Sequence, residues 1–335
     1  MPVTPPVPGP AGFAAALAAG PLVLDGGLSN QLAAAGHDLS DGLWSARLLA
    51  DAPEALVAAH RAYFAAGAQV AITASYQASF EGFARRGVGR AEAGRLLARG
   101  VELARAAAEE EAAGDRPRWV AASVGPYGAV PADGSEYRGR YGLSQDELEA
   151  FHRPRLEALV AAGPDVLALE TVPDADEARA LLRAVRGLGV PAWLSYSVAG
   201  GRTRAGQPLA EAFALAAEAD EVVAVGVNCC TPQDADRAVA LAARVTGKPV
   251  VVYPNSGESW DAGAREWRGE PTFRATGAAG GRGRVARWLA DGARLMGGCC
   301  RVGPDGIAAL AAELAAELAA EPTPERAAER AHGRP

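Results

Sequence analysis

Short runs of apolar residues alternate with longer stretches of helical periodicity along most of this chain. Near-continuous runs of Val, Ile, Leu and Ala are typical of strands that are buried on both faces of a parallel sheet. We expect eight such strands, at residues 21–27, 69–76, 119–128, 165–171, 191–198, 222–228, 249–257 and 293–298. Helical patterns fill the gaps between them, as at 53–67 and 144–163.

Local signals mark the ends of these helices. Ser144 stands three residues before Glu147, a spacing that predicts a capping box at the start of the helix over 144–163. Gly67 and Gly163 stand where glycines commonly end helices. The helices and the strands therefore form repeated strand–helix units.

Eight strand–helix units match the size of an α/β fold of the (β/α)₈ TIM-barrel type, which takes about 250 residues before insertions. A doubly wound sheet is the alternative, but no G-x-G-x-x-G follows the first predicted strand. Long loops are expected after strand 3, at 127–142, and after strand 7, at 255–284. Long loops in a compact fold are often functional lids, and these two would leave the same rim of the barrel.

Composition limits the class of protein and its partners. The net charge of −7 argues against a nucleic-acid partner, and the sequence contains no apolar run long enough to cross a membrane. We expect a barrel domain over 12–320, between a disordered N-terminus at 1–11 and a disordered tail at 321–335. Four cysteines in a chain of this length, with no signal peptide, favour a cytoplasmic location.

The cysteines form two adjacent pairs, Cys229-Cys230 and Cys299-Cys300, each at the end of a predicted strand. Both pairs would emerge at the rim where barrel enzymes place their chemistry. Three thiolates meeting there would hold a Zn²⁺ ion and leave its fourth position open for a substrate. A closed structural zinc site and plain buried thiols are the alternatives. A thiol–disulfide redox protein is disfavoured because the chain has no C-x-x-C.

Polar residues also close several of the other predicted strands. Together they suggest a substrate pocket at the same rim, although any one of them could be an ordinary strand end. They are Asp25, Tyr76, Glu170, Asn228 and Asn255.

Three short motifs give the chain a specific resemblance. DGG at 25–27, GVNC at 226–229 and GGCCR at 297–301 resemble the signatures of the zinc-dependent homocysteine methyltransferase family, whose domain is a (β/α)₈ barrel. The match runs from about residue 20 to 315. Further segments resemble its homocysteine S-methyltransferase branch, which uses S-methylmethionine and sometimes S-adenosylmethionine; they include ITASYQAS (72–79), SVGPYGA (123–129), ADGSEYRG (132–139) and VVYPNSGE (251–258).

The resemblance implies roles for individual residues. Cys229, Cys299 and Cys300 would carry the zinc, and Cys230, one residue past the motif position, would not. Three thiolates leave the site negatively charged, and the metal would lower the pKa of an incoming homocysteine thiol. The family's amino-acid pocket uses the carboxylates that are here Asp25 and Glu170, which would bind the homocysteine ammonium.

The remaining expectations concern the close approach of the substrates. Gly26 and Gly298 would let the backbone approach the ligand, although tight barrel packing also explains glycines there. Aromatic faces attract a sulfonium, and Tyr76 is the strongest candidate. Tyr127 is a second candidate, whereas Trp44 and Phe80 are equally well explained as core residues. Gln31 stands where the branch often has an acidic residue, which puts any role for that side chain in doubt.

The predicted function is methyl transfer from a sulfonium donor to the thiol of homocysteine, giving methionine. Within the family, betaine is the alternative donor, and the YQASF and ADGSEYRG segments disfavour it. A non-catalytic barrel that binds zinc or homocysteine is the alternative from another class of protein. Asp25 and Glu170 could also form a general acid/base pair of the glycosidase type, but methyl transfer to a thiolate needs none.

Overall fold

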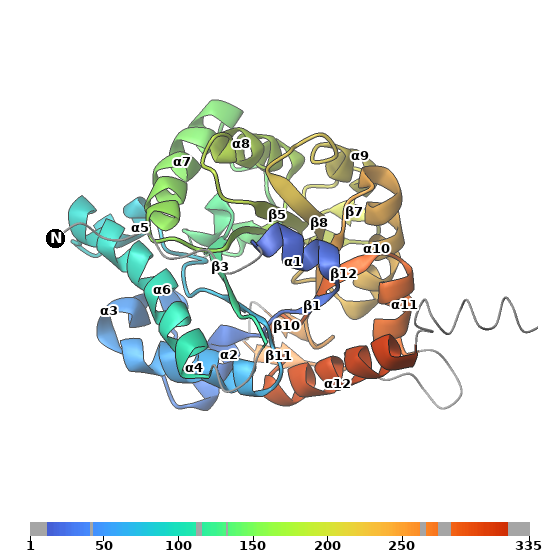
Figure 1. Ribbon diagram of the computed structural model, residues 1–335. Helices are drawn as coiled ribbons and strands as arrows, with labels where there is room; N and C mark the ends of the chain where they lie inside the picture. The colour runs from blue at the N-terminus through green and yellow to red at the C-terminus, as the bar shows by residue number, and fades with distance from the viewer. Residues whose placement is uncertain are drawn as a thin grey trace, which may run out of the picture.

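The computed structural model describes residues 12–320, apart from 41–42, 112–115, 132, 262–265 and 274–282. Eight parallel strands form one sheet in the order β1-β12-β9-β8-β5-β4-β3-β2. A parallel bridge between Leu24 and Val70 joins the two ends of that sheet. The predicted (β/α)₈ barrel is therefore confirmed, with its helices around the outside (Figure 1). The termini predicted to be disordered, 1–11 and 321–335, lie outside the described residues.

The eight barrel strands follow the predicted order, but most are shorter than their apolar runs. Their bounds are β1 (Leu22–Val23), β2 (Val70–Ile72), β3 (Trp119–Val124), β4 (Val166–Val172), β5 (Ala192–Tyr196), β8 (Val222–Asn228), β9 (Val250–Tyr253) and β12 (Ala293–Met296). The largest differences are at the carboxyl ends of β1, β2, β3 and β9, where the chain leaves the ladder. Those ends form the upper rim, which holds the polar residues.

One helix precedes β1, and the helices that follow the strands cover the outer face of the barrel. Their bounds are α1 (Phe13–Ala19), α2 (Leu28–Ala34), α3 (Leu48–Asp51), α4 (Pro53–Ala65), α5 (Phe80–Ala84), α6 (Arg90–Glu110), α7 (Gln145–Ala161), α8 (Ala175–Val185), α9 (Leu209–Ala214), α10 (Pro232–Thr246), α11 (Arg284–Ala290) and α12 (Pro304–Ala320). The capping box of Ser144 and Glu147 is present at α7. Gly67 and Gly163 follow α4 and α7 with positive φ angles of 104° and 72°. Among the described residues, no helix is long and apolar enough to cross a membrane.

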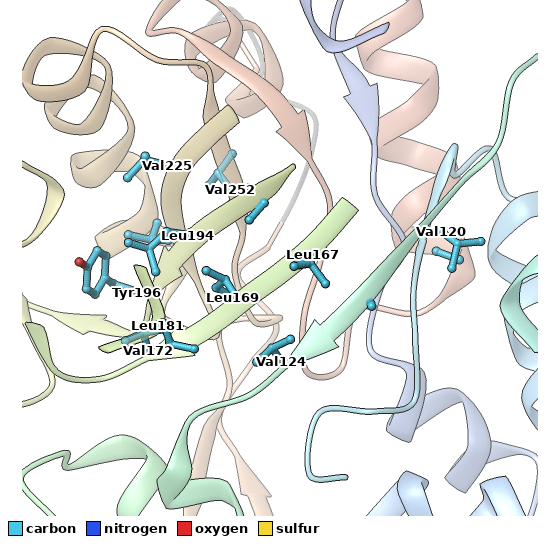
Figure 2. Close-up of a cluster of buried hydrophobic side chains, with 14 of the residues drawn as sticks. Val120, Val124, Leu167, Leu169, Val172, Leu181, Leu194, Tyr196, Val225 and Val252 are labelled. Carbon is cyan, nitrogen blue, oxygen red and sulfur yellow. The ribbon is translucent and has the colours of Figure 1, made fainter. Parts of the chain in front are cut away.

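Strand residues alternate between two buried layers because successive side chains point to opposite faces. The outward layer packs beneath the helices and includes Val120, Leu167, Leu169, Leu194 and Val225 (Figure 2). The inward layer fills the barrel and includes Trp119, Val166 and Trp193 near the starts of their strands. The core is therefore double, and the inward layer leads directly to the functional rim.

The lower end of the barrel is closed by α1, which lies across the centre of the ring of strands in Figure 1. The Phe13 ring lies 5.8 Å from the Trp119 ring and 6.4 Å from the Trp193 ring. Phe13 and Leu17 are each only 2% exposed. This helix seals the amino ends of the strands with apolar side chains.

Both long loops contain structure of their own. The loop after β3 carries two 3₁₀ turns, η2 (Tyr127–Ala129) and η3 (Ser135–Tyr137). The loop after β9 carries an antiparallel pair, β10 (Ser259–Asp261) with β11 (Glu266–Arg268). A second small pair, β6 (Val198–Ala199) with β7 (Arg202–Thr203), follows β5. A third 3₁₀ turn, η1 (Trp44–Arg47), precedes α3.

Candidate functional site

Three thiols meet at the upper rim of the barrel. Cys229 directly follows β8, and Cys299 and Cys300 follow β12 after two glycines. The three sulfur atoms lie within 4.8 Å of one another, and Cys229 Sγ lies 3.8 Å from Cys300 Sγ. A tetrahedral Zn²⁺ at about 2.3 Å from each sulfur would place the sulfurs about 3.8 Å apart. The cluster can therefore hold a metal ion.

The backbone turns sharply at Cys229. Its φ angle is +48°, so the residue is left-handed rather than extended. A left-handed conformation is uncommon for a residue with a side chain and is worth explaining. Here it accompanies a turn of the chain at the end of β8, where the Cys229 sulfur joins the cluster. Cys230 is fully buried among core residues and lies outside the group of three.

The protonation of the thiols follows from their contacts and burial. Hydrogen bonds from Cys299 and Cys300 lower the pKa of Cys229 well below its ordinary value. The Tyr137 hydroxyl, 3.3 Å from Cys229 Sγ, acts in the same direction. Burial raises the pKa of Cys230 far above its ordinary value. Cys229 thus accepts the hydrogen bonds within the cluster, whereas Cys230 stays a neutral thiol.

Two buried carboxyl groups face the same rim. Asp25 Oδ2 accepts a hydrogen bond of 2.8 Å from the Ile72 amide, and Asp25 Oδ1 has no partner among the described residues. Glu170, on β4, is only 6% exposed. Burial raises the pKa of Glu170 to about 7 and the pKa of Asp25 well above its ordinary value, and Glu170 adds to the shift of Asp25. A bound cation would offset the unfavourable burial of both carboxylates.

A web of hydrogen bonds fixes Glu170 in place. Its Oε1 accepts from the Ser123 hydroxyl, and its Oε2 accepts from the Tyr253 hydroxyl at 3.0 Å. Tyr253 also lies 2.8 Å from the Ser195 hydroxyl. All these side chains come from the inward faces of β3, β4, β5 and β9. The carboxylate is therefore positioned before any ligand arrives.

Asn228, predicted to bind substrate, is fully buried and already bonded within the protein. Its Oδ1 accepts from the Thr171 amide at 2.7 Å and from the Ser195 hydroxyl at 2.9 Å. Its Nδ2 donates to Thr171 Oγ1 at 2.7 Å. These contacts join β4, β5 and β8, so the structure gives Asn228 a bracing role at the rim.

The two predicted rim glycines face the protein itself. A Cβ on Gly26 would lie 2.1 Å from the Val302 carbonyl oxygen, and one on Gly298 would lie 2.3 Å from Val302 Cγ1. A side chain at Gly26 or Gly298 would therefore push the end of its strand away from the turn that contains Val302. Close packing of this turn accounts for both glycines.

The predicted aromatic residues separate into two groups. Tyr76 is half-buried, hydrogen-bonds Thr171 and interacts with the charges of Cys229 and Glu170. Tyr127 instead packs on Phe151 of α7, with ring centroids 5.0 Å apart. The Phe80 ring is occupied by the Arg90 guanidinium at 4.2 Å. The Trp44 side chain lies outside the described part of the chain, so Tyr76 is the one of the four predicted aromatic residues that interacts with a thiol of the cluster.

Asn255, which follows β9, and two residues of the loop after β3 complete the rim. The Asn255 amide donates to the Cys230 carbonyl at 3.0 Å, and its buried Oδ1 has no partner among the described residues. The Tyr137 hydroxyl of η3 lies beside Cys229, and the charge of Cys229 acts on the preceding residue, Glu136. Neither residue is among the predicted site residues. Their signal in the sequence is a Ser-Glu-Tyr turn between Gly134 and Gly139, both of which have positive φ.

Comparisons with known proteins agree with this geometry. The family model described as homocysteine S-methyltransferase matches residues 22–314. The homocysteine S-methyltransferase YbgG of Bacillus subtilis is 44% identical over 299 residues, covering 87% of this chain and 93% of the relative. The homocysteine S-methyltransferase of Escherichia coli is 45% identical over 297 residues, covering 87% of this chain and 94% of the relative.

A solved structure supports the same conclusion. The metallated form of the homocysteine methyltransferase MmuM from Escherichia coli is 42% identical, with a TM-score of 0.76. The match covers 87% of this chain and 95% of that chain. With a thiol cluster and two buried carboxyl groups at the rim of a (β/α)₈ barrel, this chain belongs to the homocysteine S-methyltransferase family.

Proposed function

We propose that this protein is a zinc-dependent enzyme that transfers a methyl group from a sulfonium donor to the thiol of L-homocysteine. S-Methylmethionine is the proposed donor, with S-adenosylmethionine as a second one. The observation that carries the proposal is that three sulfurs within 4.8 Å of one another share a rim with two buried carboxyl groups. This arrangement suits an amino acid whose own sulfur must be activated.

The donor set fits a zinc ion. Cys229, Cys299 and Cys300 would hold it, and the 3.8 Å between two of their sulfurs equals the spacing of about 3.8 Å expected at a tetrahedral zinc. A solved relative, the Escherichia coli enzyme, is a metallated form, which supports metal binding here. When bound, Zn²⁺ would supply the charge that keeps the homocysteine thiol deprotonated at neutral pH.

The carboxyl groups of the chain would orient homocysteine. Its ammonium would donate to Glu170 and to the free Oδ1 of Asp25, forming charge-assisted hydrogen bonds. Ser123 and Tyr253 hold Glu170 in position, so little reorganisation accompanies binding. The homocysteine sulfur would then point toward the cysteine cluster.

The reaction is a direct displacement at carbon. The homocysteine sulfur attacks the donor methyl in line, and a new S–C bond forms as the donor S–C bond breaks. The bonding pair stays on the donor sulfur, which becomes a neutral thioether. Because opposite charges are neutralised in this step, a site that excludes water favours it. The Tyr76 ring would hold the sulfonium before the transfer.

The test is methionine formation from homocysteine with S-methylmethionine, S-adenosylmethionine and betaine, measured side by side. We expect turnover with S-methylmethionine, less with S-adenosylmethionine and none with betaine. Preference for betaine would assign the chain to the other donor class. Binding of zinc and homocysteine without turnover of any donor would show a non-catalytic barrel.

We also propose a cytoplasmic location. All four cysteines are free thiols in the structure. Free thiols are typical of a reducing compartment such as the cytoplasm. Location of a tagged full-length chain by cell fractionation tests this.

A further inference from the structure

The second 3₁₀ turn of the β3 loop, η3, lies over the thiol cluster. The Tyr137 hydroxyl is 3.3 Å from Cys229 Sγ. The preceding residue, Glu136, is a carboxylic acid that is only 6% exposed. Its Oε2 is buried and has no hydrogen-bond partner among the described residues. A buried carboxylate oxygen of this kind needs an explanation.

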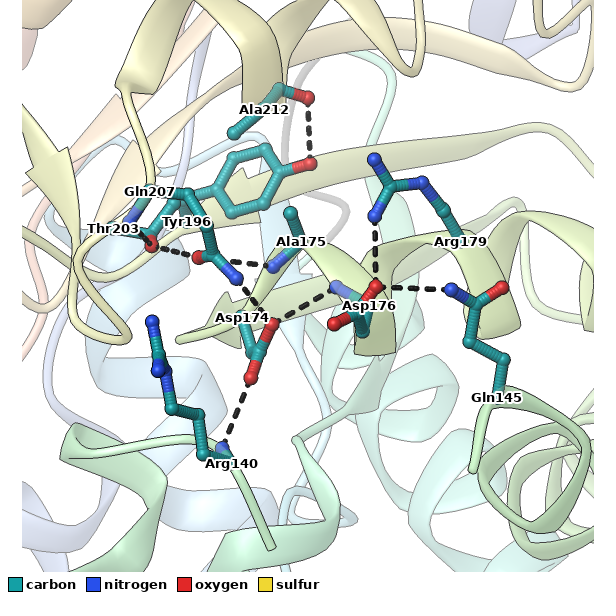
Figure 3. A network of polar contacts seen from close by, with 10 residues as sticks. All are labelled: Arg140, Gln145, Asp174, Ala175, Asp176, Arg179, Tyr196, Thr203, Gln207 and Ala212. Carbon is teal, nitrogen blue, oxygen red and sulfur yellow. Dashed lines mark hydrogen bonds and ion pairs between the residues drawn. The ribbon is translucent and has the colours of Figure 1, made fainter. Parts of the chain in front are cut away.

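The loop that carries Glu136 is anchored at both ends. The Tyr127 amide donates to Glu177 Oε1 at 2.6 Å, and the Arg140 amide donates to Asp174 Oδ2 at 2.9 Å. Gln207 donates to the other oxygen of Asp174 at 2.7 Å, as Figure 3 shows. The position of Glu136 is therefore set by the fold.

The cations near Glu136 are directed elsewhere. Arg138 is largely exposed and pairs with Asp133. Arg204 lies over the Tyr137 ring at 5.6 Å and donates to the Ser197 hydroxyl at 3.2 Å. Burial and the charge of Cys229 raise the pKa of Glu136 to about 7. An unpaired buried carboxylate is unfavourable in general. The charge of Arg138 acts on Glu136 in the opposite direction, but the structure shows no ion pair with Glu136 among the described residues.

Glu136 is also separate from the pair proposed to bind homocysteine. Asp25 and Glu170 interact electrostatically with each other. Glu136 interacts with Cys229 and with Tyr76, the proposed sulfonium contact, and Glu170 also interacts with both of these residues. Glu136 lies on the loop above the strand ends, whereas the other two carboxyl groups lie at the strand ends. The charge of Glu136 therefore reaches Tyr76, the residue proposed to hold the sulfonium.

We propose that Glu136 binds the α-ammonium group of the methyl donor, and so selects an amino-acid sulfonium over donors without an amino group. This assignment rests on the proposed function. An ammonium brings both the positive charge and the N–H donor that Glu136 Oε2 lacks. A sulfonium or a quaternary ammonium brings charge but no N–H.

The chemistry of the step favours the ammonium over the sulfonium as the partner of Glu136. The sulfonium loses its charge during the transfer, so a carboxylate beside it would stabilise the ground state more than the transition state. The ammonium keeps its charge throughout, so its contact contributes equally to both states. Such uniform binding lowers KM and leaves kcat unchanged.

The test compares Glu136→Gln with the unchanged protein on two donors: S-methylmethionine and its analogue without the amino group, 4-(dimethylsulfonio)butanoate. We expect KM for S-methylmethionine to rise by roughly 10- to 100-fold, the usual effect of losing a charge-assisted hydrogen bond. The values of kcat, homocysteine KM and zinc content should stay unchanged. With the analogue as donor, the KM values of the two proteins should agree within about twofold. If the analogue binds without turnover, its inhibition constant serves for the same comparison.

Glu157→Gln is the matched control, because it makes the same substitution at an exposed carboxylate of α7 that pairs with Arg153. It should leave both donors unaffected. An equal loss on both donors, or a rise in homocysteine KM, would overturn the assignment. The unchanged protein adds an independent check, since it should bind the analogue roughly 10- to 100-fold more weakly than S-methylmethionine. Absence of any turnover with S-methylmethionine would overturn the proposed function itself.

Discussion

The two ends of the barrel are built from the same strands but from opposite kinds of inward side chain. At the amino end, Trp119 and Trp193 pack against Phe13 of α1. At the carboxyl end, the same strands present Ser123 and Ser195, which belong to the web around Glu170. The inward side chains of one strand therefore change from large and apolar to small and polar over two to four residues.

The difference separates stability from chemistry. The amino end buries large apolar surfaces, which favour folding by about 25 cal/mol for each Å² removed from water. The carboxyl end buries carboxyl groups such as Asp25 and Glu170, whose burial raises their pKa values and opposes folding. Changes at one end should thus alter stability, and changes at the other should alter activity.

The largest expected effect is at the thiol cluster. Cys299→Ser should remove essentially all bound zinc and reduce activity to background, because two thiolates hold the metal far more weakly than three. Cys230→Ser is the matched control and should keep zinc and activity, since its sulfur lies outside the cluster. Metal analysis and methionine assays check both variants. A metal-free Cys299→Ser protein with full activity would rule out the zinc mechanism.

The next effect is on stability at the opposite end. Phe13→Ala should lower the free energy of unfolding by about 3–5 kcal/mol, as for other large-to-small changes in a core. Kinetic constants measured well below the melting temperature should stay unchanged. Leu318→Ala, at a side chain that is 41% exposed, should cost less than about 0.5 kcal/mol. A changed homocysteine KM in Phe13→Ala would show that the two ends are coupled.

Glu170 tests whether the functional end opposes folding. Its pKa rises from 4.5 to about 7 on burial, so between these values the folded state binds more protons than the unfolded state. The free energy of unfolding should therefore fall as the pH rises through this window. Relative to Glu170→Gln, the unchanged protein should lose up to about 3 kcal/mol between pH 4.5 and 7. Urea unfolding of both proteins across this range provides the measurement, and parallel curves would contradict the expectation.

The smallest effect concerns the donor. Tyr76→Ala should raise KM for S-methylmethionine by very roughly two- to thirtyfold, the range of a cation–π contact. Homocysteine KM should change little, and Tyr76→Phe should recover much of the loss because it keeps the ring. Phe80→Ala serves as the control, since its ring already faces Arg90. An unchanged donor KM in Tyr76→Ala would place the sulfonium elsewhere on the rim.

Much of this architecture can be predicted from the sequence because it follows periodic patterns. The order of the eight barrel strands and the capping box at Ser144 depend on local signals, and both are confirmed. The predicted strands extend too far at 21–27 and 249–257 because apolar residues continue past the point where the ladder ends. Local hydrophobicity does not distinguish a strand end from the turn that follows it.

The site was harder to predict where a loop supplies the residue. Cys229, Cys299 and Cys300 belong to strand ends, and the structure brings them together as predicted. Tyr127 and Glu136 lie in one loop, and the sequence drew attention to Tyr127 instead of Glu136. Tyr127 packs on α7, whereas η3 places Glu136 where the charge of Cys229 acts on it. The path of a 16-residue loop depends on its anchors, Asp174 and Glu177, which are far away in the sequence.

Those anchors have a consequence for protein engineering and for the evolution of the loop. The segment 127–142 is held by side chains near the start of α8, directly after the strand that carries Glu170. A transplanted loop would arrive in a foreign barrel without these carboxylates and would lose its shape. Designers who wish to graft donor preference should therefore move 127–142 together with β4 and α8. We expect natural recombination between relatives to exchange the loop, β4 and α8 together as one segment.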